Sequence, residues 1–321
     1  MLFQIATADV EQPTIWQQHI STLLKITLLR RKVFGGERFP FIVWWVCDID
    51  LDALLSGPGP GEFVGHMLKN DLIPPPSFHL YPLGADGSSI VYPEERDSLP
   101  IALQLNYEVA LHAIKLGLLA REFRADTSFG TADMHQKSMA ITMRQSRMAE
   151  IREGLRQLWT VPSVQELGQM RLSVRGQRLF HHAWTLYRAC IIYSHTSMWP
   201  GQRMDTAPDF EPEIYTASQQ ILQASRAIVE ADSNSSRFLV FPLFMAGFAS
   251  SVGSEKMMVI DMIQQMEQGC IVGRNTRATR KALEAVYERQ NRQFMRNGHS
   301  LDVCWLEVMA ERGMTVVNFG L

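Results

Sequence analysis

The interpretation of the fold depends first on residues 39–63, F-P-F-I-V-W-W-V-C-D-I-D-L-D-A-L-L-S-G-P-G-P-G-E-F. The segment Phe41–Leu55 is apolar on most sides, which predicts a buried helix. Its β-branched and aromatic residues also suit a strand, but neither a hairpin nor a β-α-β pattern surrounds it. The run G-P-G-P-G at 57–61 ends the helix, so we expect a rigid turn there.

Three aspartates, Asp48, Asp50 and Asp52, occupy every second position in this segment. A calcium loop that starts at Asp48 would need glycine at its sixth position and glutamate at its twelfth, where the sequence has Ala53 and Gly59. On a helix, Asp48 and Asp52 share one face and Asp50 points elsewhere. We expect an acidic helix face with arginines across a groove. A pair of carboxyl groups with shifted pKa values for acid–base chemistry stays open.

Apolar residues recur at helical spacing along the whole chain. Further helices are expected over Pro13–Arg31, Glu62–Leu68, Leu99–Phe123, Met139–Trp159, Arg175–Trp199, Ile214–Glu230, Phe238–Ser251, Ser254–Gln268, Thr276–Arg296 and Leu301–Arg312. No alternation of apolar and polar residues persists long enough for a sheet, and no repeat of fixed period is present. The sequence therefore predicts an all-α fold, a single domain over residues 1–321 with roughly ten helices around one core.

Residues 73–97 interrupt the helical pattern. They contain P-P-P at 74–76, two further prolines at 82 and 93, and G-A-D-G-S-S at 84–89. Proline cannot continue a helix from within, because it lacks the backbone N–H and clashes with the preceding turn. We expect a long connection here, either a lid over a cavity or a spacer.

Composition and charge narrow the class of protein. The 321 residues are 46% apolar and 20% charged, which is typical of globular proteins, and the net charge of −2 favours neither DNA nor an anionic membrane. The four cysteines at 47, 190, 270 and 304 form no C-x-x-C pair, so we expect reduced, mostly buried thiols inside a cell. The first residues lack the pattern of a signal peptide, and the longest apolar run, 238–249, is too short to span a bilayer.

The motifs of several enzyme classes are missing. The glycine run at 57–61 is not G-x-G-x-x-G, and its prolines lack the N–H groups that would bind a phosphate. The string A-S-S-V-G at 249–253 lacks the strand that precedes a nucleophilic serine. The nine histidines include no H-x-x-x-H pair, and His181 and His182 point in different directions on a helix. We therefore expect no metal and no cofactor, and we interpret the basic stretch at 273–281 as a solvated helix start.

The segment R-G-Q-R-L-F-H-H-A-W-T-L-Y-R-A-C-I-I-Y-S-H-T-S-M-W at 175–199 combines aromatic rings with polar tips. Such a stripe is usually part of the core, and we favour core packing for each residue taken singly. In an all-α chain the same combination also suits the wall of a pocket for a small apolar metabolite. The residues expected to line such a pocket are Trp45, His112, Trp184, Tyr187, Tyr193 and His195.

Four stretches, taken together, resemble the fungal-specific transcription factor domain. They are F-P-F-I-V-W-W-V-C-D-I-D-L-D-A-L-L-S-G-P-G-P-G-E-F-V at 39–64, I-I-Y-S-H-T-S-M-W-P-G-Q at 191–202, F-P-L-F-M-A-G-F-A-S at 241–250 and L-D-V-C-W-L-E-V-M-A-E-R-G at 301–313. The likeness extends from Trp16 to the C-terminus. It implies an all-helical region of nuclear, often dimeric activators or repressors, which senses metabolites or binds partner proteins, and it brings no catalytic residues.

The DNA-binding part of such regulators needs six closely spaced cysteines that hold two zinc ions, and this chain has four isolated ones. The resemblance therefore implies no specific DNA binding by this chain itself. Either the chain is part of a longer regulator, or it stands alone and is free to evolve as a ligand binder, a co-regulator or an enzyme. We expect a nuclear location in the first case and a cytoplasmic one in the second.

Three functions stay open. The leading hypothesis is a regulatory, effector-sensing domain that binds a small apolar metabolite, a partner protein or a second copy of itself as a homodimer. The alternative is a cyclase or isomerase of fungal secondary metabolism that works without a cofactor. Its acid–base groups would come from His181, His182, His195, Tyr193, Asp48 and Asp52. The third is a protein-binding scaffold without a pocket.

Overall fold

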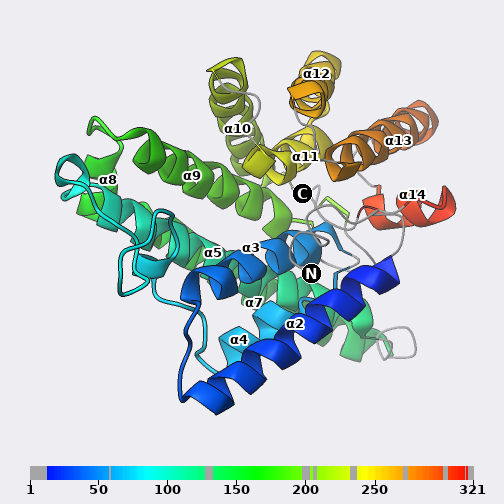
Figure 1. The fold of residues 1–321 in the computed structure, drawn as a ribbon. Helices are drawn as coiled ribbons and strands as arrows, with labels where there is room; N and C mark the ends of the chain where they lie inside the picture. Colours follow the sequence, from blue (N-terminus) through cyan, green and yellow to red (C-terminus); the bar gives the residue numbers. More distant parts are fainter. Residues whose placement is uncertain are drawn as a thin grey trace.

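The computed structural model of the chain describes residues 13–57, 59–126, 133–196, 203–204, 208–231, 237–269, 274–298, 303–314 and 316. These ranges form twelve α-helices and three 3-10 helices and contain no strand, so the predicted all-α fold is confirmed (Figure 1). The α-helices are α2 (Pro13–Phe34), α3 (Pro40–Ser56), α4 (Glu62–Lys69), α5 (Leu99–Ala125), α7 (Met134–Leu158), α8 (Pro162–Leu167), α9 (Val174–Ser194), α10 (Glu211–Ala231), α11 (Val240–Ala249), α12 (Gly253–Gly269), α13 (Arg274–Asn297) and α14 (Trp305–Glu311). The 3-10 helices are η1 (Pro76–Phe78), η2 (Pro93–Glu95) and η3 (Arg237–Leu239).

Helix α3 is the apolar segment quoted first, and it is buried as predicted. Its buried residues run from Val43 to Ser56 and lie on most sides of the helix, because α4, α5 and α11 pack around it. The stripe of Phe41, Trp45, Asp48 and Asp52 is partly buried. In Figure 1 it crosses the middle of the molecule between α2 and α9. Gly57 ends the helix with a φ of 106°, a backbone conformation that residues with a Cβ rarely adopt. Its N–H donates a hydrogen bond to the carbonyl of Leu54.

Helices α9 and α11 organise the second half of the chain. Helix α9 packs against α5, α7, α10 and α11, and α11, whose ten residues are all buried, also contacts α12 and α13. Trp305 of α14 closes this region, with its ring centroid 5.0 Å from that of Phe248 and 6.1 Å from that of Tyr193. Buried apolar side chains from Trp16 to Val316 form one continuous cluster.

Several helix bounds differ from the prediction. Helix α7 begins at Met134 instead of Met139, because Asp133 accepts a hydrogen bond from the N–H of Gln136 and forms a capping box with it. Helix α8 was not predicted. Helix α9 ends at Ser194, and the last residues of the predicted helix, 197–199, lie outside the described ranges. The final helix begins at Trp305 instead of Leu301.

The proline-rich connection at 73–97 packs against two helices. The imidazole of His79 stacks on Trp44 of α3 with the ring centroids 3.5 Å apart, and its Nε2 lies 2.7 Å from the carbonyl oxygen of Pro74. At the other end, the buried Glu95 accepts hydrogen bonds from Ser173 Oγ at 2.5 Å and from Arg175 Nε at 2.8 Å. The connection is therefore attached both to α3 and to the start of α9.

Candidate functional site

A cavity of about 460 Å³ lies between α3, α9, η3 and the connection at 79–81. Its walls include Phe41 and Asp48 of α3, His79, Leu80 and Tyr81 of the connection, Arg175, Arg178, Leu179 and His182 of α9, and Phe238 of η3. This volume falls within the range of about 300–1,000 Å³ that is usual for small-molecule sites. Aromatic and aliphatic side chains surround a few polar groups, which is the usual composition of such a site.

Asp48 and His182 bring acid–base groups to this cavity. Both side chains are partly buried, and both border the cavity. Burial raises the pKa of Asp48, an effect that His182 partly opposes. Burial lowers the pKa of His182, which Asp48 opposes and Arg178 reinforces. The site therefore holds a carboxyl group that keeps its proton more strongly than usual beside an imidazole that favours its neutral form.

Asp52 lies one helical turn beyond Asp48 on the same face of α3. Burial, followed by the negative charge of Asp48, raises its pKa well above the usual value. The prediction that Asp48 and Asp52 share a face is confirmed, but this face points into the protein and is not a solvated acidic surface. Among the described residues, no arginine forms an ion pair with either carboxylate, and Arg175, which borders the same cavity, is bound to Glu95.

The middle aspartate has a separate role. Asp50 Oδ2 accepts hydrogen bonds from the backbone N–H groups of Phe63 at 2.9 Å and Val64 at 3.0 Å, in the first turn of α4. Burial raises the pKa of Asp50 to about 6, although both hydrogen bonds act in the opposite direction. Asp50 thus caps α4 from a neighbouring helix and does not face the cavity.

Arg178 stands at the solvent side of the cavity. Its side chain is exposed, and the described residues give it neither a hydrogen bond nor an ion pair. Arg175, one turn earlier, is bound to Glu95 and to the carbonyl of Ile90. Arg178 is therefore the cation of this site that is available to a ligand.

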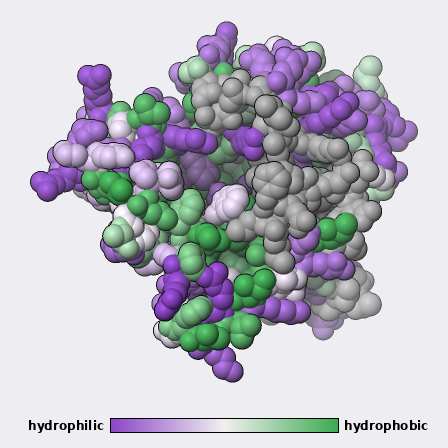
Figure 2. All heavy atoms as spheres, in the orientation of Figure 1, coloured by the Kyte–Doolittle hydropathy of each residue, from purple (hydrophilic) through white to green (hydrophobic). Residues whose placement is uncertain are grey.

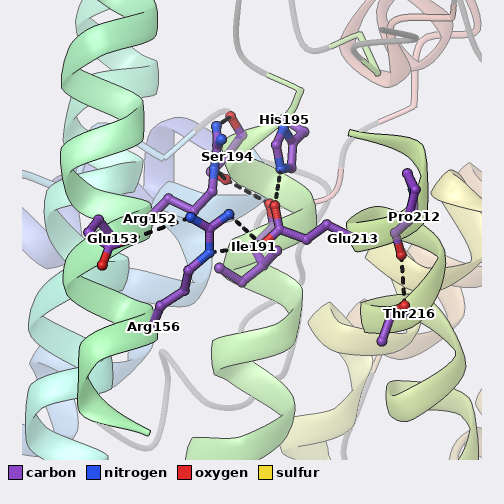
Figure 3. A network of polar contacts seen from close by, with 9 residues as sticks. All are labelled: Arg152, Glu153, Arg156, Ile191, Ser194, His195, Pro212, Glu213 and Thr216. Atoms are coloured by element: carbon purple, nitrogen blue, oxygen red, sulfur yellow. Dashed lines mark hydrogen bonds and ion pairs between the residues drawn. The ribbon is translucent and has the colours of Figure 1, made fainter. Parts of the chain in front are cut away.

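A second polar cluster lies where α7, α9 and α10 meet (Figure 3). Glu213 accepts hydrogen bonds from His195 Nε2 at 2.9 Å and from Arg156 Nη2 at 2.6 Å, and Arg152 Nε donates to Ser194 Oγ at 2.8 Å. Burial alone would raise the pKa of Glu213, but the hydrogen bonds from His195 and Arg156 outweigh it and lower the pKa to about 2. These groups bond to one another, and the geometry is that of a tie between three helices.

The remaining residues of the predicted site lie in separate places. Trp184 and Tyr187 pack around Trp159, with ring centroids 4.8 and 5.1 Å away. Tyr193 lies in the core beside Phe241 and Trp305. Three further candidates are also apart from the cavity, Trp45 against the core, His181 beside Phe180, and His112 at the contact between α5 and α7 near Gly154.

Of the predicted site residues, the structure therefore brings Asp48 and His182 together at the cavity, and Asp52 lies one turn from Asp48 outside its lining. Arg178 and Phe238 were not predicted. The sequence holds a signal for the first, since Arg178 precedes His182 by four residues and must share its face on a helix. It holds none for Phe238, which reaches the cavity through tertiary packing alone.

No group of three or more His, Cys, Asp or Glu side chains among the described residues is arranged to hold a metal ion. Of the helices that the structure describes, none combines the length and the apolar character needed to cross a bilayer.

Comparison with known proteins gives one match. The family model described as "Fungal specific transcription factor domain" matches residues 114–319, which include three of the four stretches that suggested the resemblance; the stretch at 39–64 precedes the match. Searches of curated proteins and of solved structures gave no significant match. The matched residues make up more than half of the chain and associate it with transcriptional regulation in general. The chain belongs to the family of fungal specific transcription factor domains.

Proposed function

We propose that this chain is an effector-sensing domain of fungal transcriptional control that acts in the nucleus, and that its effector binds in the cavity between α3 and α9. The observation that carries the proposal is the juxtaposition of Asp48 and His182 inside an otherwise largely apolar cavity of about 460 Å³. Two ionisable groups without partners of their own are costly to bury, unless a proton or a ligand satisfies them. Membership in the family supports the regulatory part of the proposal.

The cavity suits a small metabolite with an apolar body and a polar group at each end. Phe41, Leu179 and Phe238 would contact the body. The protonated carboxyl of Asp48 and the neutral imidazole of His182 would exchange hydrogen bonds with a hydroxyl or carbonyl group. The guanidinium of Arg178 would pair with an anionic end, because Arg binds carboxylates in a bidentate geometry.

The walls explain how binding would be transmitted. They come from α3, α9, η3 and the connection at 79–81, and η3 leads directly into the buried helix α11. A ligand that contacts all four stabilises the arrangement in which they lie together. If the walls exchange between this arrangement and a more open one, the ligand would favour the first. The size of the shift equals the difference between its binding free energies for the two arrangements.

The first test separates the cavity from the regulatory role. The fluorescent probe 8-anilino-1-naphthalenesulfonate has an apolar body and an anionic end and should bind the purified chain. Leu179→Trp fills the cavity and should abolish this binding, whereas Gln177→Trp, at an exposed position of the same helix, should leave it unchanged. Equal binding by both variants would rule out this cavity as the site.

The second test addresses transcription. The chain is fused to an unrelated DNA-binding domain in a fungal host, and a reporter gene is measured. We expect the fusion to change reporter output, and Leu179→Trp to alter that change while Gln177→Trp does not. A fusion without any effect on the reporter would overturn the regulatory proposal, whatever the probe binds.

The same pair of groups favours a second candidate function, a cofactor-independent isomerase or cyclase. A carboxyl group with a raised pKa can donate a proton near neutral pH, and a neutral imidazole can accept one. This candidate predicts turnover of a hydroxy or keto metabolite by the purified chain, which Asp48→Asn and His182→Gln each reduce by at least about a hundredfold. Turnover that survives both substitutions would reject these two residues as the catalytic groups.

A further inference from the structure

The second half of helix α2 extends beyond the body of the protein. In its first half, Trp16, Ile20, Leu23 and Leu24 are buried, and α2 packs chiefly against α4. No residue from position 25 to position 40 is fully buried. In Figure 1, the end of α2 is the lowest part of the molecule and lies away from the other helices.

This projecting end carries an apolar stripe. Ile26, Leu29 and Val33 are 39%, 61% and 66% exposed, and their spacing places them along one side of the helix. Phe34 and Phe39 are also exposed where the chain turns toward α3. In Figure 2, green apolar spheres lie among purple ones at the bottom of the view, over the end of α2. Apart from Leu28, which packs against the core, these turns bury little and gain little from tertiary packing. Contiguous exposed apolar groups mark interaction sites.

The same region is strongly basic. Residues 25–39, which we call the α2 tip, contain Lys25, Arg30, Arg31, Lys32, Arg38 and a single acidic residue, Glu37, in a chain whose net charge is −2. Helix α2 itself has no acidic residue at all.

The cations of the α2 tip have no acidic partners among the described residues. The guanidinium of Arg30 lies 4.2 Å from the ring centroid of Phe39, and that of Arg38 lies 4.2 Å from the ring centroid of Phe34. Glu37 is engaged by the N–H of Phe39 at 2.8 Å. The two stacked arginines thus remain free to bind an anion while their aromatic partners stay exposed beside them.

We propose that the α2 tip is a docking surface for an acidic amphipathic helix of a partner protein. The carboxylates of such a helix would pair with the cations, and its apolar face would cover the stripe of Ile26, Leu29 and Val33. Phosphates of a nucleic acid would satisfy only the cations. A second copy of this chain would cover only the apolar stripe and would bring five more cations against the first five.

A groove beside the tip provides room for the partner. Its volume is about 720 Å³, and it lies between Arg31, Arg38 and Phe39 on one side and residues 72–76 on the other. The acidic side chains that line it, apart from Glu37, are Asp71 and Asp86, on the wall away from α2. This separation of charge orients the partner, with its carboxylates toward α2.

The test uses a fluorescent synthetic peptide of about 18 residues that has Leu and Phe at i, i+3, i+4 and i+7 and Asp or Glu elsewhere. Its binding to the purified chain is followed by anisotropy. We expect a Kd in the micromolar range, weaker at high salt, and no comparable binding by a peptide of the same composition in shuffled order. The double substitutions Leu29→Asn with Val33→Asn, and Arg31→Glu with Lys32→Glu, should each weaken binding by at least about tenfold.

Exposed positions elsewhere provide the controls. Val174→Asn and Arg171→Glu change an apolar and a basic residue outside the α2 tip and should leave binding unchanged. All six substituted residues are exposed or partly exposed, and circular dichroism with the thermal midpoint checks that folding is preserved. Absent binding, equal binding of the shuffled peptide, or binding that the two tip variants do not weaken would overturn the proposal.

Two further measurements test the other occupants. Sedimentation velocity would overturn the proposal if the chain dimerised and Leu29→Asn with Val33→Asn made it monomeric. Vesicles with phosphatidylserine would overturn it if they bound the chain through the tip residues more tightly than the peptide does. Monomeric behaviour and weaker vesicle binding are the results we expect. None of these readouts depends on the cavity, so the failure of either proposal leaves the other standing.

Discussion

Asp50 turns away from the face that Asp48 and Asp52 share and serves α4 instead. The N-cap residue of α4, Gly61, has no side chain that could accept the first N–H groups of the helix. Asp50 Oδ2 supplies that acceptor from α3, thirteen residues earlier in the sequence. A helix of only eight residues is thereby fixed to the central helix of the fold.

The removal of this carboxylate should destabilise the protein. Asp50→Ala leaves the buried N–H groups of Phe63 and Val64 without an acceptor, and we expect the free energy of unfolding to fall by about 1–3 kcal/mol. Asp50→Asn keeps an acceptor oxygen and should cost less. Urea denaturation measures both, and Asp97→Ala, at an exposed position two residues before α5, serves as the control that should change little. Equal stability of all three variants would contradict the capping role.

Asp50 should also give the protein a particular dependence on pH. Because its pKa in the folded protein is about 6 and that of an unfolded aspartate is near 3.8, the folded state binds the proton more tightly. The contribution of Asp50 is therefore complete below pH 4 and is lost as the pH rises through 6. Relative to Asp50→Asn, the wild-type free energy of unfolding should fall by up to about 3 kcal/mol between pH 4 and pH 7. A constant difference across this range would refute the shifted pKa.

At the scale of the elements, alanine substitutions at Gly117 and Gly65 test helix packing, because they should change the stability in opposite directions. A Cβ at Gly117 in α5 would lie 2.8 Å from Leu54 Cγ in α3, whose side chain is fully buried and cannot move aside. Gly117→Ala should therefore cost about 1–2 kcal/mol, despite the better helix propensity of alanine. At Gly65 the nearest atom is 3.4 Å away, so Gly65→Ala should gain about 0.5–1 kcal/mol. Thermal unfolding measures both variants. A shift of both midpoints in the same direction would contradict this account of the packing.

One ion pair attaches the end of the connection at 73–97 to the start of α9. Hydrogen bonds from Arg175 lower the pKa of Glu95 to about 2, so the stabilisation is present above pH 4.5 and is lost as the pH falls through 2. Glu95→Gln should raise the rate of amide hydrogen exchange at Ser89 and Ile90 several-fold at pH 7, because the ion pair that fixes Arg175 against their segment is lost. Glu94→Gln, the exposed neighbour, should change neither rate. Unchanged exchange in Glu95→Gln would show that other contacts hold the segment.

The interiors of the long helices could be predicted because the apolar residues that each helix buries recur in the sequence at helical spacing. Their ends depend on caps. The capping box of Asp133 and Gln136 is a local signal that would have placed the start of α7 correctly. Helix α8 has six residues, too few for a periodic pattern, so only Pro162 at its first position indicated it.

On the scale of the whole molecule, the site was harder to predict than the fold. Asp48 and His182 were both candidates, but no local pattern pairs residues more than a hundred positions apart. On the aromatic stripe, Tyr187 is a buried member of the core, and Trp184 packs edge-on against Trp159. The face of α9 that borders the cavity carries Arg178 and His182 instead, and its walls are completed only when η3 packs nearby.

The burial of α3 on most of its sides has a consequence for synthesis of the chain. The ribosome delivers this helix long before its partners, since α5 begins at Leu99 and α11 at Val240. At about 5–20 residues per second, roughly 10–40 seconds separate the appearance of α3 from that of α11. During this interval the nascent chain displays an apolar helix that cannot yet be covered, so α3 is where we expect a chaperone to bind the growing polypeptide first.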